Sequence, residues 1–62
     1  MSLREIRKSK GLTLPQMAEI VGVHHTHLSR IETGKITPSL KIAFKIAAGY
    51  DITIERLRDL LL

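Results

Sequence analysis

The sequence lacks the residues on which several kinds of chemistry depend. It has no cysteine, which excludes disulfides, thiolate nucleophiles and cysteine-ligated zinc. Phe44 and Tyr50 are its only aromatic residues, so it offers few platforms for stacking the bases of single-stranded nucleic acid. No apolar run approaches the roughly 20 residues that span a bilayer, and no signal-peptide pattern opens the chain. We therefore expect a small cytoplasmic protein that does not associate with membranes.

Positive charge is concentrated in the first four-fifths of the chain. Residues 1–50 hold eight lysines and arginines against three acidic residues, whereas residues 51–62 hold two basic and three acidic residues. The whole chain carries a formal net charge of +4. Such a balance favours an anionic partner, and the scarcity of aromatic residues favours duplex DNA over single strands.

Apolar residues recur at spacings of three and four, which predicts helices and no strands. Residues typical of helix ends set the boundaries, and the clearest is the capping box of Thr13 and Gln16. The predicted fold is all-α, with five helices over about residues 2–10, 14–21, 25–32, 39–50 and 54–61. All of them belong to one compact domain, residues 1–62.

The same apolar stripes predict a core and leave a surplus. The expected core is Leu3, Ile6, Leu12, Met17, Ala18, Val21, Val23, Leu28, Ile31, Leu40, Ala43, Ala47, Ile52 and Leu57. The surplus lies in the last two helices and includes Phe44, Ile54, Leu60 and Leu61. An apolar surplus on so small a domain suggests a partner surface. The alternative is that these side chains complete the core of the monomer.

The segment GVHHTHLSRIETGK, residues 22–35, carries the most informative side chains. On a helix of roughly 100° per residue, one face is polar and the opposite face is apolar. The polar face holds His25, Thr26, Ser29, Arg30 and Thr33. An arginine there can donate two hydrogen bonds to guanine O6 and N7, and a threonine can contact a base or the thymine methyl. The helix N-terminus beside His24 favours a phosphate.

Three histidines in four positions also raise other interpretations. His24 and His27 are three residues apart, but His25 projects elsewhere, and a zinc site needs at least three protein ligands. We therefore expect no metal and no cofactor. A pH sensor is a second alternative, because neighbouring phosphates would raise the proton affinity of the histidines, so that binding would strengthen as the pH falls through about 6.5. The third alternative is an ordinary solvated helix face.

The stretch LTLPQMAEIVGVHHTHLSRIETGKITPSL resembles the helix-turn-helix of the lambda-repressor and Cro family, also called the XRE-type family. The likeness extends from Leu3 to Leu57 and includes Gly22 at the turn, the motif SRIETGK and the PSL that follows it. It implies a helix-turn-helix over about residues 14–33. In such proteins the third helix lies in the major groove and the second crosses the DNA backbone.

The resemblance also implies roles for matching positions. The base-contacting residues would be His25, Thr26, Ser29 and Arg30, and the phosphate-contacting residues His24, Thr33 and Lys35. Arg7 and Glu32 match a buried ion pair that ties the first helix to the third. The chain departs from the family at three positions, with Leu14 in place of a glutamine, His24 in place of a capping serine or threonine, and Asp51 in place of a glycine. Gln16 is the candidate to replace the missing phosphate contact.

The resemblance further implies a homodimer formed through the C-terminal helix, for which the interface candidates are Phe44, Ile54, Leu60 and Leu61. The sequence thus predicts a sequence-specific double-stranded DNA-binding transcriptional regulator, a repressor above all, on a palindromic operator. One alternative is an antitoxin or restriction-controller protein that regulates its own operon. Another is a protein-interaction module that uses the last two helices. An enzyme is not expected, because the histidines lack an orienting acid and a substrate pocket.

Overall fold

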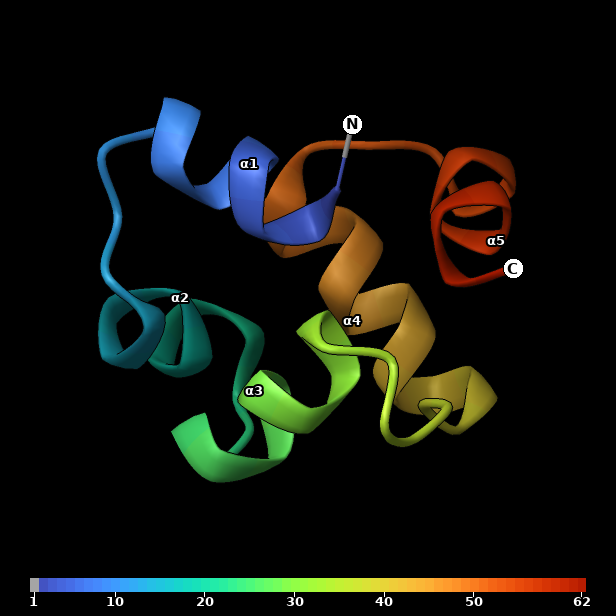
Figure 1. Ribbon diagram of the computed structural model, residues 1–62, viewed down its shortest axis with the longest axis horizontal. Coiled ribbons are helices and arrows are strands. Elements are labelled where there is room, and N and C mark those ends of the chain that lie inside the picture. The colour runs from blue at the N-terminus through green and yellow to red at the C-terminus, as the bar shows by residue number, and fades with distance from the viewer. Residues whose placement is uncertain (1) are drawn as a thin grey trace.

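Five helices make up the computed structural model, which describes residues 2–62 (Figure 1). They are α1 (Leu3–Ser9), α2 (Leu14–Val21), α3 (His25–Glu32), α4 (Leu40–Tyr50) and α5 (Ile54–Leu61). No strand occurs within these described residues, so the all-α prediction is confirmed. The predicted bounds of α2, α3 and α5 agree with the structure. The predicted α1 is one residue too long at each end, and the predicted α4 begins one residue too early.

Side chains that cap helix N-termini explain why the boundaries fall where they do. Thr13 and Gln16 form the predicted capping box, since the Thr13 hydroxyl accepts from the Gln16 N–H and the Gln16 side chain accepts from the Thr13 N–H. Ser2 and Glu5 form a second capping box, which was not predicted from the sequence. At the other end of α2, Gly22 takes a φ of 87°, which only glycine adopts without strain. The chain can therefore turn sharply into α3.

α4 is the central helix of the fold. It packs against α1, α2 and α5, while α2 packs against α3. Figure 1 shows α2 and α5 at opposite ends of the molecule, with α4 between them. Gly49 allows the close approach of α2, because a Cβ at this position would lie 2.8 Å from Cγ2 of Val21. This packing holds the helix-turn-helix against the rest of the protein.

The core differs from the predicted one at six positions. Leu40 was expected to be buried but is 70% exposed. It is the first residue of α4, and the buried side of that helix is formed by Ala43, Ile46, Ala47 and Tyr50. Ile46 and Tyr50 are fully buried and were absent from the predicted core. Three other predicted members, Leu12, Val23 and Ile52, are only partly buried at its edge.

Asp51 ends α4 in the left-handed conformation, which glycine adopts most easily. Its φ and ψ are 59° and 45°, and the following N–H of Ile52 donates to the Ala47 carbonyl at 3.0 Å. This hydrogen bond satisfies one of the carbonyls that a helix C-terminus leaves without an internal partner. An aspartate therefore replaces the expected glycine. Within residues 2–62, no helix is both long enough and apolar enough to cross a membrane.

Candidate nucleic-acid interface

α3 buries one face and leaves the other open to solvent. Leu28 and Ile31 are 0% and 1% exposed and anchor the helix in the core. On the opposite side, His25, Thr26 and Arg30 are exposed. Ser29 is half-buried, so it can reach a ligand only at the edge of this face. The structure thus brings the four expected base-contacting residues together on one helix.

His24 caps α3 with its imidazole ring. Its Nδ1 accepts a hydrogen bond of 3.1 Å from the Thr26 N–H, which requires Nδ1 to be unprotonated. In the neutral ring the proton then resides on Nε2, where it is available to an external acceptor such as a phosphate oxygen. The ring of His25 stacks on that of His24, with centroids 4.4 Å apart. The missing serine or threonine cap is therefore replaced by the histidine itself.

Gln16 has one end of its side-chain amide occupied. Oε1 accepts from the Thr13 N–H at 2.9 Å within the capping box. The amide nitrogen lies at the other end of the group and can still donate to an anion. Gln16 is exposed at the start of α2, in the first turn that also contains Leu14. This orientation is compatible with the expected phosphate contact.

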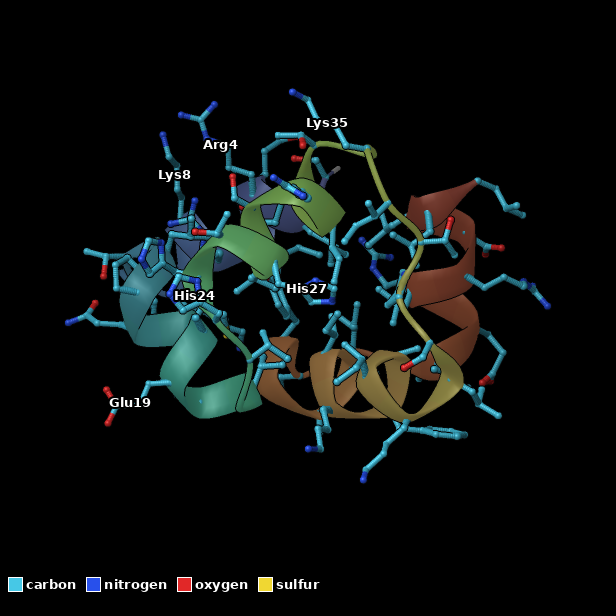
Figure 2. All side chains as sticks on the ribbon, turned by 90° about the horizontal axis from the view of Figure 1, so that it is seen from below. Arg4, Lys8, Glu19, His24, His27 and Lys35 are labelled. Atoms are coloured by element: carbon cyan, nitrogen blue, oxygen red, sulfur yellow. The ribbon has the colours of Figure 1, made fainter. Side chains whose placement is uncertain are left out.

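Thr33 and Lys35 follow the end of α3 but differ in whether their side-chain donors are free to bind a phosphate. The Thr33 hydroxyl is within hydrogen-bonding distance of two carbonyls at the end of α3, those of Ser29 at 3.0 Å and Arg30 at 3.3 Å. A hydroxyl has one hydrogen to donate, so Thr33 would have to release α3 before it donated to a phosphate. Lys35 is exposed, and Figure 2 shows its side chain extending away from the protein. Lys35 is the stronger candidate of the two.

The structure places Arg7 and Glu32 in direct contact between α1 and α3. Nε of Arg7 lies 2.9 Å from Oε2 of Glu32, and Nη2 donates to Oε1 at 3.3 Å. The two side chains are only 10% and 5% exposed. A third hydrogen bond runs from Nη1 of Arg7 to the Leu12 carbonyl at 3.0 Å. The contact therefore has the buried geometry that the family resemblance implies.

Tyr50 joins this ion pair from α4 and was not anticipated. Its hydroxyl donates to Oε2 of Glu32 at 2.5 Å, and its ring is fully buried. Burial and the hydrogen bond to Glu32 raise the pKa of the Tyr50 hydroxyl far above its usual range, so it keeps its proton. Every fully buried side-chain nitrogen or oxygen within residues 2–62 has a hydrogen-bond partner. Arg7, Glu32 and Tyr50, termed here the buried triad, thus fix α3 relative to both α1 and α4.

The proposed dimer residues do not all lie on one surface. Ile54 and Leu61 line a groove of about 420 Å³ between α4 and α5, termed here the α4–α5 groove. Leu40 and Leu62 also line it and are 70% and 97% exposed. Phe44 is 55% exposed one helical turn after Leu40. Leu60 lines a different hollow with residues of α1 and α3 and does not line this groove.

The histidines do not form part of a recognisable metal centre. Within residues 2–62 there is no group of three or more histidine, aspartate or glutamate side chains placed to hold a metal ion.

Comparison with known proteins agrees with this geometry. The family model described as helix-turn-helix matches residues 3–57. This chain belongs to the helix-turn-helix family. A relative from Archaeoglobus fulgidus, called an uncharacterized HTH-type transcriptional regulator, is 40% identical over 55 residues, which are 89% of this chain and 79% of that protein.

Two further relatives extend the comparison. HTH-type transcriptional regulator MJ0272 of Methanocaldococcus jannaschii, also called uncharacterized, is 42% identical over 53 residues, 86% of this chain and 80% of its own length. HTH-type transcriptional regulator SinR of Bacillus subtilis is 36% identical over 58 residues, 92% of this chain and 52% of SinR. The expected family is therefore confirmed.

Proposed function

We propose that this chain is a cytoplasmic, sequence-specific, double-stranded DNA-binding transcriptional repressor that acts as a homodimer. The observation that carries the proposal is the division of α3, whose apolar face is wholly buried while its polar face is open. A helix fixed in this way can enter the major groove and present side chains to base edges. The family relationship supports the same role, because the relatives are named as transcriptional regulators.

Within this proposal, the side chains on the polar face of α3 contact the bases. Arg30 donates two hydrogen bonds to a guanine, and His25 and Thr26 contact the neighbouring bases. Ser29 supports them from the edge of the face. Because hydrogen bonds to base edges depend on base identity, these four residues set the preferred sequence.

Phosphate contacts supply affinity that is independent of sequence. His24 donates from Nε2, Gln16 from its amide nitrogen, and Lys35 from its ammonium group. Thr33 contributes less to this set, because its hydroxyl already donates to the end of α3. The N-termini of α2 and α3 add backbone N–H groups and a positive dipole end.

A second copy of the chain is the proposed occupant of the α4–α5 groove. Exposed Leu40 and Leu62 border a groove that Ile54 and Leu61 line, so an isologous contact would cover apolar surface from both copies. Figure 1 shows α5 at the end of the molecule opposite α2. Pairing at this end would leave both copies of α3 free to occupy half-sites about one DNA turn, or 10 base pairs, apart.

The same groove supports a second candidate function, that of a protein-interaction module. An antitoxin or restriction-controller protein would combine the two, since it would bind DNA through α3 and regulate its own operon. The observation that favours a protein partner is the exposure of Leu40 and Leu62 at an apolar groove, and of Phe44 one helical turn after Leu40. This exposure is equally compatible with a different protein and with a second copy of the chain, so we keep the homodimer as the main proposal.

Selection of bound sequences from a random pool of duplex DNA at near-physiological salt tests the proposal. We expect a palindrome with half-sites about 10 base pairs apart. Salt-sensitive binding without any enriched sequence would contradict sequence recognition and would favour the interaction module. Sedimentation as a monomer at high micromolar concentration, with DNA binding unchanged, would contradict the homodimer.

A further inference from the structure

α2, the first helix of the helix-turn-helix, and α1, the helix before it, differ sharply in charge. α2, with the sequence LPQMAEIV, contains no lysine or arginine and carries the exposed Glu19. α1, with the sequence LREIRKS, contains Arg4, Arg7 and Lys8 and one acidic residue, Glu5, whose carboxylate accepts from the Ser2 N–H in the capping box. Leu3, Ile6 and Arg7 form the buried side of α1, which leaves Arg4 and Lys8 exposed one turn apart on one face. We propose that Arg4 and Lys8, termed here the α1 ridge, bind phosphates of the DNA duplex beside the bases that α3 contacts.

Both side chains of the α1 ridge are available to an external anion. Among residues 2–62, neither Arg4 nor Lys8 makes a side-chain ion pair or hydrogen bond. Lys10 differs, because its Nζ lies 3.8 Å from Oδ2 of Asp51. Two unpaired cations at a spacing of one helical turn therefore remain for a ligand that carries repeated negative charge.

The α1 ridge faces the side of the molecule on which a phosphate contact is already proposed. Figure 2 shows the side chains of Arg4, Lys8 and Lys35 extending from the same side, whereas Glu19 lies toward the opposite side. The three cations come from α1 and from the loop after α3, which are separate elements. A single extended polyanion would meet all of them without meeting Glu19 closely.

The position of the α1 ridge relative to α3 is held by the buried triad. Arg7 lies in the sequence between Arg4 and Lys8, and its guanidinium contacts Glu32 at the end of α3 at 2.9 Å. The major groove is about 12 Å wide, and a helix with its side chains nearly fills it. The principal extents of the protein are 23, 21 and 19 Å, so with α3 in the groove the protein would also cover the phosphate strands that border it. The α1 ridge would thus bind backbone in a fixed register with base recognition.

This inference rests on the proposed function. It explains how the chain compensates for the lack of basic residues on α2. With Leu14 in place of the family's glutamine and without any basic residue, α2 offers only Gln16 and its N-terminus to the backbone. α1 would supply the missing electrostatic affinity. The α1 ridge would strengthen binding to all duplexes and leave the preferred sequence unchanged.

The test compares Arg4→Gln/Lys8→Gln with the matched control Lys41→Gln/Lys45→Gln. The control removes the same charge from exposed positions of α4, so it reports the effect of net charge alone. The affinity of each protein is measured between about 50 and 200 mM salt, for a duplex carrying the selected site and for a random duplex of equal length. Circular dichroism is used to check that both variants keep the helical content and thermal midpoint of the wild type.

We expect the α1 variant to reduce the slope of log K against log salt by about two, because each lost phosphate contact contributes about one. The α1 variant should lose the same factor in affinity on both duplexes, and the α4 control variant should lose distinctly less affinity. If the wild type binds the selected site and the two variants behave alike, the α1 ridge is refuted while the proposed function stands. If the wild type binds no duplex DNA, both are refuted.

Discussion

Two ion pairs of this protein have similar geometry and opposite surroundings. Arg7 and Glu32 meet at 2.9 Å with side chains 10% and 5% exposed, whereas Arg58 and Asp59 meet at 3.2 Å with both side chains 66% exposed. The first pair joins α1 to α3 and is completed by Leu12 and Tyr50. The second joins neighbouring residues of α5. The difference teaches that the position of α3 depends on desolvated charge, while α5 carries its charges in water.

The energetic consequence follows from solvation. A charge removed from water must recover its lost hydration from its partners, so deleting one partner leaves the other uncompensated. An exposed charge keeps its hydration and gains little from a partner. Because the buried triad uses an arginine, a glutamate and a tyrosine from three helices, loss of any member should disturb the placement of α3.

The largest expected effect belongs to Arg7→Met. It leaves the Glu32 carboxylate buried with Tyr50 as its remaining side-chain partner, which should lower the free energy of unfolding by ~3–5 kcal/mol. Urea denaturation followed by circular dichroism measures the loss. The double variant Arg7→Met/Glu32→Leu is the control, since removing both charges should restore part of the stability. A loss below ~1 kcal/mol for Arg7→Met would contradict a buried pair.

Tyr50→Phe should have the next largest effect. It keeps the buried ring and removes the hydroxyl that donates to Glu32, so the expected loss is ~1.5–3 kcal/mol, as for other hydrogen bonds to charged groups. The measurement is the same denaturation at neutral pH. A change indistinguishable from zero would mean that Glu32 is satisfied by Arg7 alone.

Alkaline pH sharpens the prediction for Tyr50. Because its pKa is raised in the folded state, the unfolded chain releases this proton first as the pH rises through the ordinary tyrosine value of about 10. The unfolded state then binds fewer protons than the folded state, so stability falls with rising pH. The stability that the wild type holds over Tyr50→Phe should therefore shrink above about pH 10. A constant difference would contradict the direction of the pKa shift.

Asp59→Asn should have the smallest effect. The carboxylate is mostly solvated and, among residues 2–62, pairs with the neighbouring Arg58, so the free energy of unfolding should change by less than about 1 kcal/mol. The comparison with Arg7→Met under identical conditions is direct, since each variant removes one charge from an ion pair. A loss equal to that of Arg7→Met would overturn the contrast between the two pairs.

Most of the fold could be predicted because the information is local. The capping box of Thr13 and Gln16, the turn at Gly22 and the apolar spacing within each helix act over a few residues. The burial of Tyr50 could not be predicted in this way, because its hydroxyl partner Glu32 lies on another helix, 18 residues away in sequence. Leu40 has the apolar character of a core residue but precedes the buried face of α4. Contacts between elements were thus the part that sequence periodicity left open.

The candidate interface shows the same division. The polar face of α3 follows from helical spacing alone, and the structure leaves His25, Thr26 and Arg30 exposed as expected. What the spacing could not reveal is which polar groups already have partners. The Thr33 hydroxyl and Nδ1 of His24 are both used to stabilise α3. Whether these residues can also bind DNA depends on which of their hydrogen-bonding atoms are still free, which the residue type alone does not reveal.

The central claim, that α3 recognises base sequence, is tested most directly by comparing Arg30→Ala with Lys35→Ala. Both affinities are measured at one salt concentration on the selected site, on single-base variants of it and on a random duplex. We expect Arg30→Ala to cost ~1–3 kcal/mol on the selected site and to remove the preference at one base position. Lys35→Ala should weaken binding to all duplexes alike. Equal losses on every duplex for both variants would contradict base recognition by α3.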